Sequence, residues 1–176
     1  PEIYICTSNR NAGKTTFFNR YFVKRFINYG EQFIILYRYK HELDDCAIKF
    51  FNDVGSLFFP NSCLENKSRS KGLYHELLLD GITCGYALAL NSSDNIKRYS
   101  HIFNNVQRII FDEFQSESNN YCNKEVSKLI SIHTSVARGQ NKQVRYVPVF
   151  LIGNFVSLLN PYYVELGITE KLNKNA

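Results

Sequence analysis

The sequence predicts an α/β fold, a three-layer sandwich in which helices cover both faces of a mainly parallel β-sheet that a β-hairpin extends. Strand-like and helix-like segments alternate along the chain. The segments 33–37, 108–111 and 147–152 are almost continuously apolar, as expected of strands buried on both faces of a parallel sheet. Two further strand-like runs flank an Asp-Gly pair, the pattern of a hairpin. These observations predict a layered domain whose ligands bind at the carboxyl ends of the strands.

The first part of the chain predicts a strand, a loop and a helix in that order. Residues 3–6 are apolar and β-prone, and turn-forming residues lead from them to Lys14. From Lys14, aromatic residues recur at helical spacing as far as Gly30, which favours the end of a helix. The second strand and a helix over about 41–53 follow, and the polar stretch 60–72 predicts a loop.

The second part of the chain predicts the hairpin and two more core strands. Residues 73–79 and 82–90 flank Asp80-Gly81, which suits a type I′ turn because both central residues of that turn need positive φ. A polar stretch, a strand, a helix, a last strand and a polar tail come next, at 91–100, 108–111, about 123–137, 147–152 and 170–176. No internal repeat is present, so a single domain spanning residues 1–176 is expected.

Composition excludes several classes of protein. Of the 176 residues, 21% are charged and 15% are aromatic, which argues against an intrinsically disordered chain. No apolar run approaches the roughly 20 residues that a membrane helix needs, so no membrane partner is expected. The five cysteines are dispersed and never spaced CxxC, which favours reduced thiols in a cytoplasmic setting over a disulfide framework or a zinc ribbon. A net charge of +5 allows nucleic acid as a partner without requiring it.

A phosphate-binding loop is predicted between the first strand and the first helix. The segment fits GxxxxGK[ST], except that Ser8 replaces the first glycine and raises the conformational cost if that position needs positive φ. Backbone N–H groups in such a loop surround polyphosphate, and the helix N-terminus adds a favourable dipole. Lys14 is expected to reach the β- and γ-phosphates of ATP and Thr15 to bind Mg²⁺. The predicted nucleotide-binding residues are Ser8, Asn9, Arg10, Asn11, Ala12, Gly13, Lys14, Thr15 and Thr16, the last in a structural role. The alternative is a GKT sequence that occurs by chance at a helix start.

Two adjacent carboxylates, Asp112 and Glu113, follow the apolar strand 108–111. An aspartate at a strand end holds Mg²⁺, usually through its water shell. The neighbouring glutamate is then placed to orient and deprotonate the water that attacks the γ-phosphate. Taken alone, such a pair is more often a solvated turn. Together with the upstream phosphate loop, it predicts a Walker B motif with a catalytic glutamate, and ATP hydrolysis as the preferred reaction.

Two more residues are candidates for this site. Asn154 follows the last apolar strand, where an amide can contact the γ-phosphate or the attacking water as a sensor; a turn or cap asparagine is an equally weighted alternative. Arg138 stands at the end of a predicted helix and fits an arginine finger that enters a neighbouring subunit's site in trans. The alternative for Arg138 is a cation that stabilises a helix C-terminus. Arg145 competes for the finger role, although packing or surface exposure is expected of it.

The other basic residues and the histidines receive no catalytic role. Arg38 and Lys40, at the end of the second strand, favour surface positions over contacts with phosphate or nucleic acid. The basic residues of the stretch 60–72 favour a solvated loop over a nucleic-acid contact. The four histidines show no metal-like or triad-like arrangement, and His133 fits the buried face of a helix.

With these motifs in order, the chain resembles the ATPase domain of bacteriophage DNA-packaging motors, the large-terminase-like group and especially the small packaging ATPases of phi29-like podophages. The resemblance spans nearly the whole chain and rests on SNRNAGKTT, LYRYKHEL, RIIFDEF and LIGNF, followed by Asn160-Pro161-Tyr162. It implies a P-loop NTPase of the additional-strand, catalytic-glutamate class, in which the strand of Asn154 lies between the phosphate-loop strand and the Asp112 strand. It also implies that the tail from about residue 168 leads through a linker into a C-terminal domain that this sequence lacks.

The resemblance further implies roles for individual residues and a set of partners. Lys14 and Thr15 would contact phosphate and Mg²⁺, Asp112 would hold Mg²⁺ through water, Glu113 would be the catalytic base, Asn154 the sensor or coupling residue, and Arg138 the trans-acting arginine. The implied partners are double-stranded DNA, further copies of the chain in a homo-oligomeric ring, often a pentamer, and the portal of a procapsid. The implied setting is the cytoplasm of the infected bacterial host, with transient docking on the procapsid.

Two other functions stay open at this stage. Another P-loop enzyme, a helicase or a nucleotide kinase, also fits the phosphate loop, and a kinase would need a lid that only the stretch 60–72 could supply. A non-hydrolysing nucleotide-binding scaffold fits the serine at the first glycine position.

Overall fold

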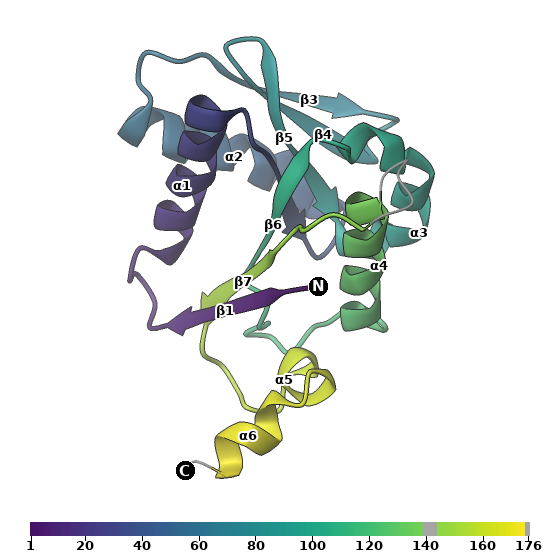
Figure 1. The fold of residues 1–176 in the computed structure, drawn as a ribbon. Coiled ribbons are helices and arrows are strands. Elements are labelled where there is room, and N and C mark those ends of the chain that lie inside the picture. The colour runs from purple at the N-terminus through teal and green to yellow at the C-terminus, as the bar shows by residue number, and fades with distance from the viewer. Residues whose placement is uncertain (139–143, 175–176) are drawn as a thin grey trace.

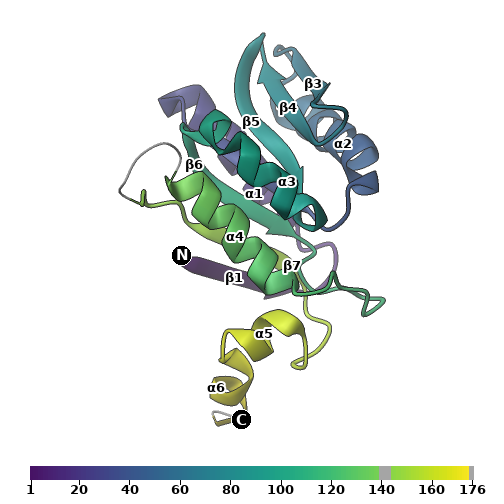
Figure 2. The same cartoon turned by 90° about the vertical axis from the view of Figure 1, so that its right-hand side faces the viewer.

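A mixed β-sheet of seven strands forms the centre of the structure, a computed structural model that describes residues 1–138 and 144–174, apart from the side chains of residues 46, 47 and 51. Helices cover both faces of this sheet, as two views of the ribbon show (Figures 1 and 2). The strands are β1 (Ile3–Ser8), β2 (Gln32–Tyr37), β3 (Leu64–Arg69), β4 (Tyr74–Leu79), β5 (Ile82–Ala89), β6 (Val106–Asp112) and β7 (Val149–Asn154). The helices are α1 (Lys14–Tyr29), α2 (His41–Phe58), α3 (Ser93–Ile96), α4 (Glu125–Arg138), α5 (Pro161–Glu165) and α6 (Ile168–Lys174), with 3₁₀ turns η1 (Leu90–Ser92) and η2 (Lys97–Phe103).

The order of the strands brings the predicted phosphate loop, Asp112 and Asn154 together at the carboxyl ends of neighbouring strands. The order is β1-β7-β6-β2-β5-β4-β3, and the first five strands run parallel while β4 and β3 continue antiparallel. The strand of Asn154 therefore lies between the phosphate-loop strand and the Asp112 strand, as expected. The register places Ser8 opposite Asn154 and Asp112 opposite Ile152. Three strand ends that are distant in the sequence thus meet at one edge.

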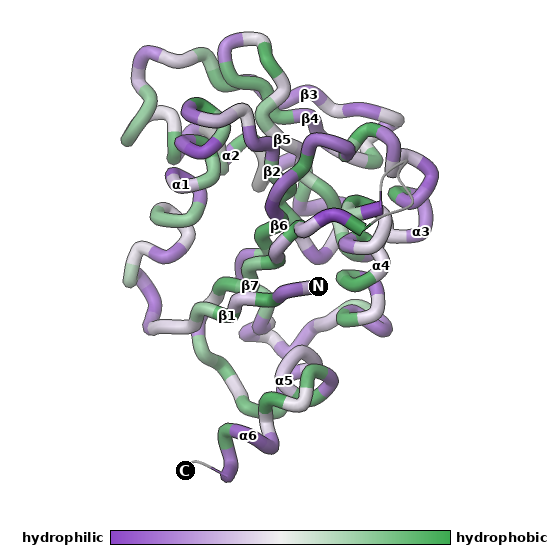
Figure 3. Tube along the Cα trace, in the orientation of Figure 1, coloured by the Kyte–Doolittle hydropathy of each residue, from purple (hydrophilic) through white to green (hydrophobic). Residues whose placement is uncertain are grey.

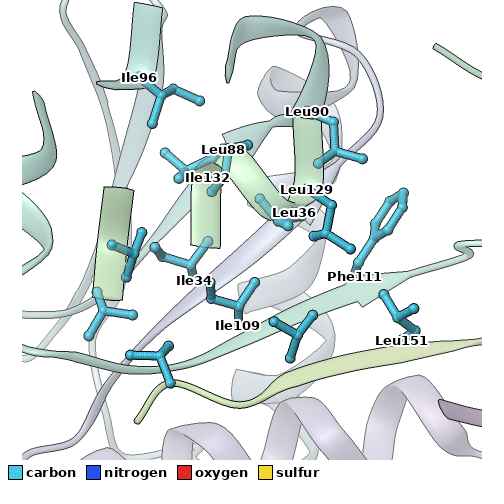
Figure 4. Packing of buried hydrophobic residues seen from close by; sticks show 14 of the residues in the cluster. Ile34, Leu36, Leu88, Leu90, Ile96, Ile109, Phe111, Leu129, Ile132 and Leu151 are labelled. Carbon is cyan, nitrogen blue, oxygen red and sulfur yellow. The ribbon is translucent and has the colours of Figure 1, made fainter. Parts of the chain in front are cut away.

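Two hydrophobic cores, one on each face of the sheet, explain why the central strands are continuously apolar. Along β2, Ile34 and Leu36 face the core beneath α4, whereas Phe33 and Ile35 face the core beneath α1 and α2. Figure 4 shows the first core, in which Ile132 of α4 lies close to strand side chains. The apolar stretches of β6 and β7 stand out in green in Figure 3. The predicted three-layer α/β arrangement follows from this burial on both faces.

Local turn chemistry agrees with the sequence at two places. Gly30 has a φ of 68° and its N–H donates to the carbonyl of Phe26, which ends α1 in the left-handed conformation that glycine adopts freely. Asp80 and Gly81 have φ values of 50° and 80°, so the hairpin between β4 and β5 has the positive φ pair of a type I′ turn.

The loop predicted over 60–72 was wrong, because residues 64–69 form the edge strand β3. This strand pairs antiparallel with β4 over its whole length, and Ser70, Lys71 and Gly72, all with positive φ, make the turn between them. Edge strands protect themselves from further pairing with charged side chains, so their sequences lose the apolar pattern that predicts a strand. The polar sequence that suggested a loop is therefore explained by the position of β3 at the edge of the sheet.

Three further boundaries differ from the prediction. Helix α2 continues to Phe58 rather than ending near 53, because Val54 is 1% exposed and extends the buried face by another turn. The polar stretch 91–100 is helical and buries Ser93 and Ile96. The polar tail is helical as far as Lys174, and residues 175–176 lie outside the described residues. Within the described part of the chain, no helix has the length and apolar character needed to cross a bilayer.

Candidate functional site

The carboxyl ends of β1, β6 and β7 and the N-terminus of α1 enclose a cavity of about 470 Å³. Its lining includes residues 10–16 of the predicted phosphate loop, Asp112 at the end of β6, Glu113 directly after it, and Asn154 at the end of β7. The predicted residues other than Ser8, Asn9 and Arg138 therefore line one cavity. Ser8 and Asn9 line an adjoining pocket that shares Arg10 and Asn154 with it. The location is where α/β sheets bind their ligands.

The loop between β1 and α1 obtains its turn from residues other than the first. Ser8 is the last residue of the extended strand β1, so serine there bears none of the conformational cost that the sequence suggested. The left-handed positions are Asn11, with a φ of 59°, and Gly13, with a φ of 77°. Asparagine and glycine are the residues that adopt this conformation most readily. No acidic residue occupies the first turn of α1, which leaves its positive dipole end uncompensated and suited to an anion.

The ammonium group of Lys14 lies among oxygen acceptors at the base of the cavity. Its Nζ donates to Ser8 Oγ at 2.8 Å, to the Asn9 carbonyl at 3.0 Å and to Asn154 Oδ1 at 3.2 Å. These acceptors hold the ammonium between the loop and the end of β7. The structure thereby joins Lys14 and Asn154, which the sequence places 140 residues apart.

A hydroxyl and a carboxylate in the lining of the cavity are hydrogen-bonded to each other. Thr15 Oγ1 donates to Asp112 Oδ2 at 2.6 Å, and Asp112 Oδ1 accepts from the N–H of Glu113 at 2.9 Å. Burial raises the pKa of Asp112, although both hydrogen bonds act in the opposite direction. The described residues hold no cluster of three metal-ligating side chains. Mg²⁺ does not need one, because it is bound by one or two carboxylates together with water and substrate phosphates, so this oxygen pair fits Mg²⁺.

Glu113 follows β6 in an unusual backbone conformation. Its φ is 55°, in the left-handed region that costs a residue other than glycine about 1–3 kcal/mol. Glu113 lines the cavity and is exposed over part of its surface. Burial raises the pKa of Glu113, and the charges of Asp112 and Glu117 add to that shift. A raised pKa brings a carboxylate closer to the range of an effective general base.

A buried ion pair supports the backbone around Glu113. The guanidinium of Arg38 contacts the Glu125 carboxylate at 2.9 Å and donates to the carbonyls of Phe114 at 2.9 Å and Glu113 at 3.3 Å. Glu125 also accepts from the Tyr162 hydroxyl at 2.6 Å. The surface position predicted for Arg38 was wrong, since Arg38 is 8% exposed and belongs to this network.

The segment after β6 is fastened to the segment after β7 by a second buried side chain. Gln115, 2% exposed, accepts through Oε1 from the N–H of Val156 at 2.9 Å and from that of Ser157 at 3.0 Å. Neither Gln115 nor the Arg38–Glu125 pair was found from the sequence. Each acts through partners in distant segments, and no local spacing points to them.

The arginine proposed as a trans finger lies far from the site of its own chain. Helix α4 starts beside Arg38 and ends at Arg138, which is exposed. Next to that end, the Ala137 carbonyl accepts from the N–H of Arg145, shortly before β7 begins. Arg138 therefore lies near the amino ends of the parallel strands, whereas the cavity lies at their carboxyl ends. Arg145 is a packing residue, as expected, whose guanidinium donates to the carbonyls of Val106, Phe103 and Val136.

The basic residues of the stretch 60–72 and the four histidines do not line the cavity. Lys67 and Arg69 lie on β3, at the far edge of the sheet, where Arg69 pairs with Glu76 at 2.7 Å. His133 is buried, as predicted, with Nε2 at 2.9 Å from the Val147 carbonyl.

Comparisons with known proteins relate the chain to phage packaging proteins. The structure superposes on the N-terminal domain of the DNA packaging ATPase from bacteriophage phi29 with a TM-score of 0.77 and 33% identity, covering 98% of this chain and 82% of that one. By fold the chain is thus related to the N-terminal ATPase domain of a phage DNA packaging protein. A family model, podovirus DNA encapsidation protein (Gp16), matches residues 3–176. The chain belongs to this family.

Two further relatives show how much of a family member the chain represents. The DNA packaging protein of Bacillus phage phi29 is 35% identical over 167 residues, which are 94% of this chain and 46% of that protein. A chain of the bacteriophage phi29 viral genome packaging motor assembly matches with a TM-score of 0.69 and 33% identity, over 94% of this chain and 46% of that one. The chain thus spans about half the length of these relatives.

Proposed function

We propose that this chain is the ATPase domain of a viral DNA-packaging motor, which hydrolyses ATP with Mg²⁺ and drives double-stranded DNA into a procapsid. One observation carries the proposal. The phosphate-loop hydroxyl of Thr15 lies 2.6 Å from Asp112, at the end of a strand that continues directly into Glu113. A P-loop, a magnesium carboxylate and a catalytic glutamate on a strand arrangement of the additional-strand class are the parts that ATP hydrolysis needs. Membership of the encapsidation family supplies the link to DNA packaging.

The residues divide the proposed reaction among them. Lys14 and the loop N–H groups bind the phosphates and balance the negative charge that develops on them. Thr15 and Asp112 would hold Mg²⁺, Asp112 through water, and Mg²⁺ would neutralise charge on the β- and γ-phosphates. Glu113 accepts a proton from water as the water oxygen bonds to the γ-phosphorus. The bond to the bridging oxygen breaks, and ADP and phosphate are the products.

The partners of the motor form part of the same proposal. The match to a chain of the packaging motor assembly supports a role within a multi-subunit complex. We propose that this complex is a homo-oligomeric ring, a pentamer, docked on the portal of a procapsid in the host cytoplasm. A net charge of +5 is compatible with a DNA substrate.

The first test is steady-state ATP hydrolysis by the protein with and without double-stranded DNA. The expected result is phosphate release that requires Mg²⁺ and rises when duplex DNA is added. Hydrolysis that neither responds to DNA nor accompanies DNA binding would contradict the packaging role. Strand separation of the duplex would instead identify a helicase, transfer of phosphate to a nucleotide acceptor a kinase, and nucleotide binding without turnover a scaffold.

Arg138 provides a second test, because it lies at the edge of the sheet opposite its own cavity. We propose that it reaches the site of a neighbouring subunit. The Arg138→Ala variant is then expected to lose about 10³-fold in kcat or more and to retain its affinity for ATP. Arg69→Ala, which removes an exposed arginine from edge strand β3, is the matched control and is expected to hydrolyse ATP normally.

Mixed assemblies distinguish a shared site from an internal one. Subunits carrying Arg138→Ala keep Glu113, and subunits carrying Glu113→Gln keep Arg138, so some interfaces of a mixed ring contain both groups. Partial recovery of hydrolysis on mixing is expected. No recovery under conditions in which mixed assemblies demonstrably form would argue against a finger in trans.

A further inference from the structure

Glu117, four residues after Glu113, lines the same cavity. Its Oε1 accepts from Arg10 Nε at 3.1 Å, and its Oε2 accepts from a terminal nitrogen of the same guanidinium. Its Oε1 also accepts from Asn154 Nδ2 at 3.3 Å. Glu117 thus bridges the phosphate loop and the end of β7. The side chains of Arg10 and Glu117 are 71% and 50% exposed, so this ion pair contributes little to the stability of the fold. Any role of the pair therefore comes from its location beside the phosphate loop.

The contact with Glu117 fixes the orientation of the Asn154 amide. Lys14 Nζ donates to Asn154 Oδ1 at 3.2 Å, on the opposite side from Glu117. A flipped amide would turn its NH₂ group towards the ammonium and its oxygen towards the carboxylate, and both contacts would be repulsive. The two charged neighbours therefore select one orientation, in which Asn154 presents its donor to an anion.

The groups that hold Glu117 are those that a phosphate would use. An arginine binds carboxylate and phosphate in the same bidentate way. Asn154 adjoins the lysine that reaches the β- and γ-phosphates in loops of this pattern, so its donor faces the terminal phosphate rather than the inner ones. Arg10, Glu117 and Asn154 all line the same cavity as the loop. A carboxylate and a terminal phosphate cannot occupy this place together.

We propose that Glu117 holds the place of the terminal phosphate: its carboxylate occupies Arg10 and Asn154 in the empty site, and the γ-phosphate of ATP displaces it from both. The inference rests on the proposed function and deepens it. ADP, which lacks the terminal phosphate, leaves Glu117 where it is. Glu117 is thus a positioning residue for Asn154 and sets the relative affinity of the site for the triphosphate and the diphosphate.

The test compares the dissociation constants of ATP and ADP, both with Mg²⁺, in a Glu113→Gln background that prevents turnover. Glu117→Gln is expected to tighten ATP binding by about threefold to tenfold and to leave ADP binding unchanged, because only the triphosphate has to displace the carboxylate. Arg10→Gln is expected to weaken ATP binding selectively, because the terminal phosphate loses a donor. Glu65→Gln removes the same charge from edge strand β3 and is expected to change neither constant.

A second measurement uses the chain that retains Glu113. Glu117→Gln is expected to lower the KM for ATP more than it changes kcat, because only the entry of the triphosphate has to displace the carboxylate. Loss of a purely structural side chain would not separate KM from kcat in this way.

The possible outcomes separate this inference from the proposed function. Equal tightening of ATP and ADP, or no change in either, would overturn the role of Glu117 while leaving an ATP-binding domain in place. Binding of neither nucleotide to the parent protein would overturn both. Thermal unfolding of each variant checks that the exposed substitutions leave the fold intact.

Discussion

Replacing Glu113 with glutamine is expected to lower kcat for ATP hydrolysis by about 10²-fold to 10⁴-fold while nucleotide binding persists. Glutamine keeps the size and hydrogen-bonding capacity of the side chain at the cavity rim but cannot accept the proton of the attacking water. Binding is retained because Lys14, Thr15 and the loop N–H groups are untouched. Steady-state phosphate release and equilibrium nucleotide binding, measured side by side, check both halves of this expectation.

Glu165→Gln is the control for that variant, because Glu165 is an exposed glutamate at the end of α5. It is expected to hydrolyse ATP at the parent rate. If Glu113→Gln were as active as the parent, Glu113 would not be the base. A loss of binding as large as the loss of rate would point instead to a role in holding the nucleotide.

The pH profile offers an independent view of Glu113. Burial and the charges of Asp112 and Glu117 raise the pKa of this carboxyl, and only its deprotonated form could act as the proposed base. Activity, measured as kcat/KM, is therefore expected to fall as pH decreases through a value above the ordinary glutamate pKa of about 4.3. The residual activity of Glu113→Gln should lack this limb.

Replacing Glu125 with alanine is expected to lower the free energy of unfolding by about 3–5 kcal/mol. Glu125 is 1% exposed, and its removal leaves the guanidinium of Arg38 buried without its counter-ion. The Tyr162 hydroxyl loses its acceptor in the same step. Urea unfolding of the variant and the parent, with equal m-values, measures the difference.

Two comparisons distinguish the cost of leaving the Arg38 charge buried without a counter-ion from the cost of lost packing. The double variant Arg38→Met, Glu125→Leu removes both charges and is expected to be more stable than Glu125→Ala alone, because the desolvation cost of a lone buried charge disappears. Arg69→Ala, which breaks the surface pair with Glu76, is expected to cost less than about 1 kcal/mol. If Glu125→Ala cost no more than Arg69→Ala, the buried pair would contribute nothing to stability.

The parts of the fold and site that the sequence predicted depend on patterns local to one segment. The phosphate loop, its preceding strand and its following helix lie within 27 consecutive residues, from Ile3 to Tyr29. The strand β6 and its two carboxylates are likewise contiguous. The alternation of strands and helices implies a parallel sheet, in which the carboxyl ends of the strands lie on the same side. Asn154, at the carboxyl end of its strand, is therefore expected at the site from the topology alone. The pairing of β7 between β1 and β6 confirms that step.

The parts that the sequence did not predict depend on pairing between distant segments. Arg38 has the sequence context of an exposed residue after a strand, and only the fold reveals Glu125, 87 positions later, as its partner. Glu117 lies in a polar run in which any residue would suit a solvated turn, and its contacts with Arg10 and Asn154 arise from the folded loop. The edge strand β3 escaped notice for a different reason, since its exposed side chains are polar. What the sequence lacks in all three cases is the identity of the residues that become neighbours in the folded chain.

The two attachments behind Glu113 have a mechanical consequence. Gln115 holds the segment after β7 at Val156 and Ser157, and Arg38 with Glu125 holds the same stretch of chain further along, at Tyr162. Between these two attachments the chain enters α5. Asn160 caps the first turn of this helix, because its side chain accepts from the N–H of Tyr163. A displacement of the backbone at Glu113 or Phe114 would therefore be transmitted to the segment after β7 through two separate sets of hydrogen bonds. The backbone next to Glu113 is thus joined by hydrogen bonds to the segment that leads into α5.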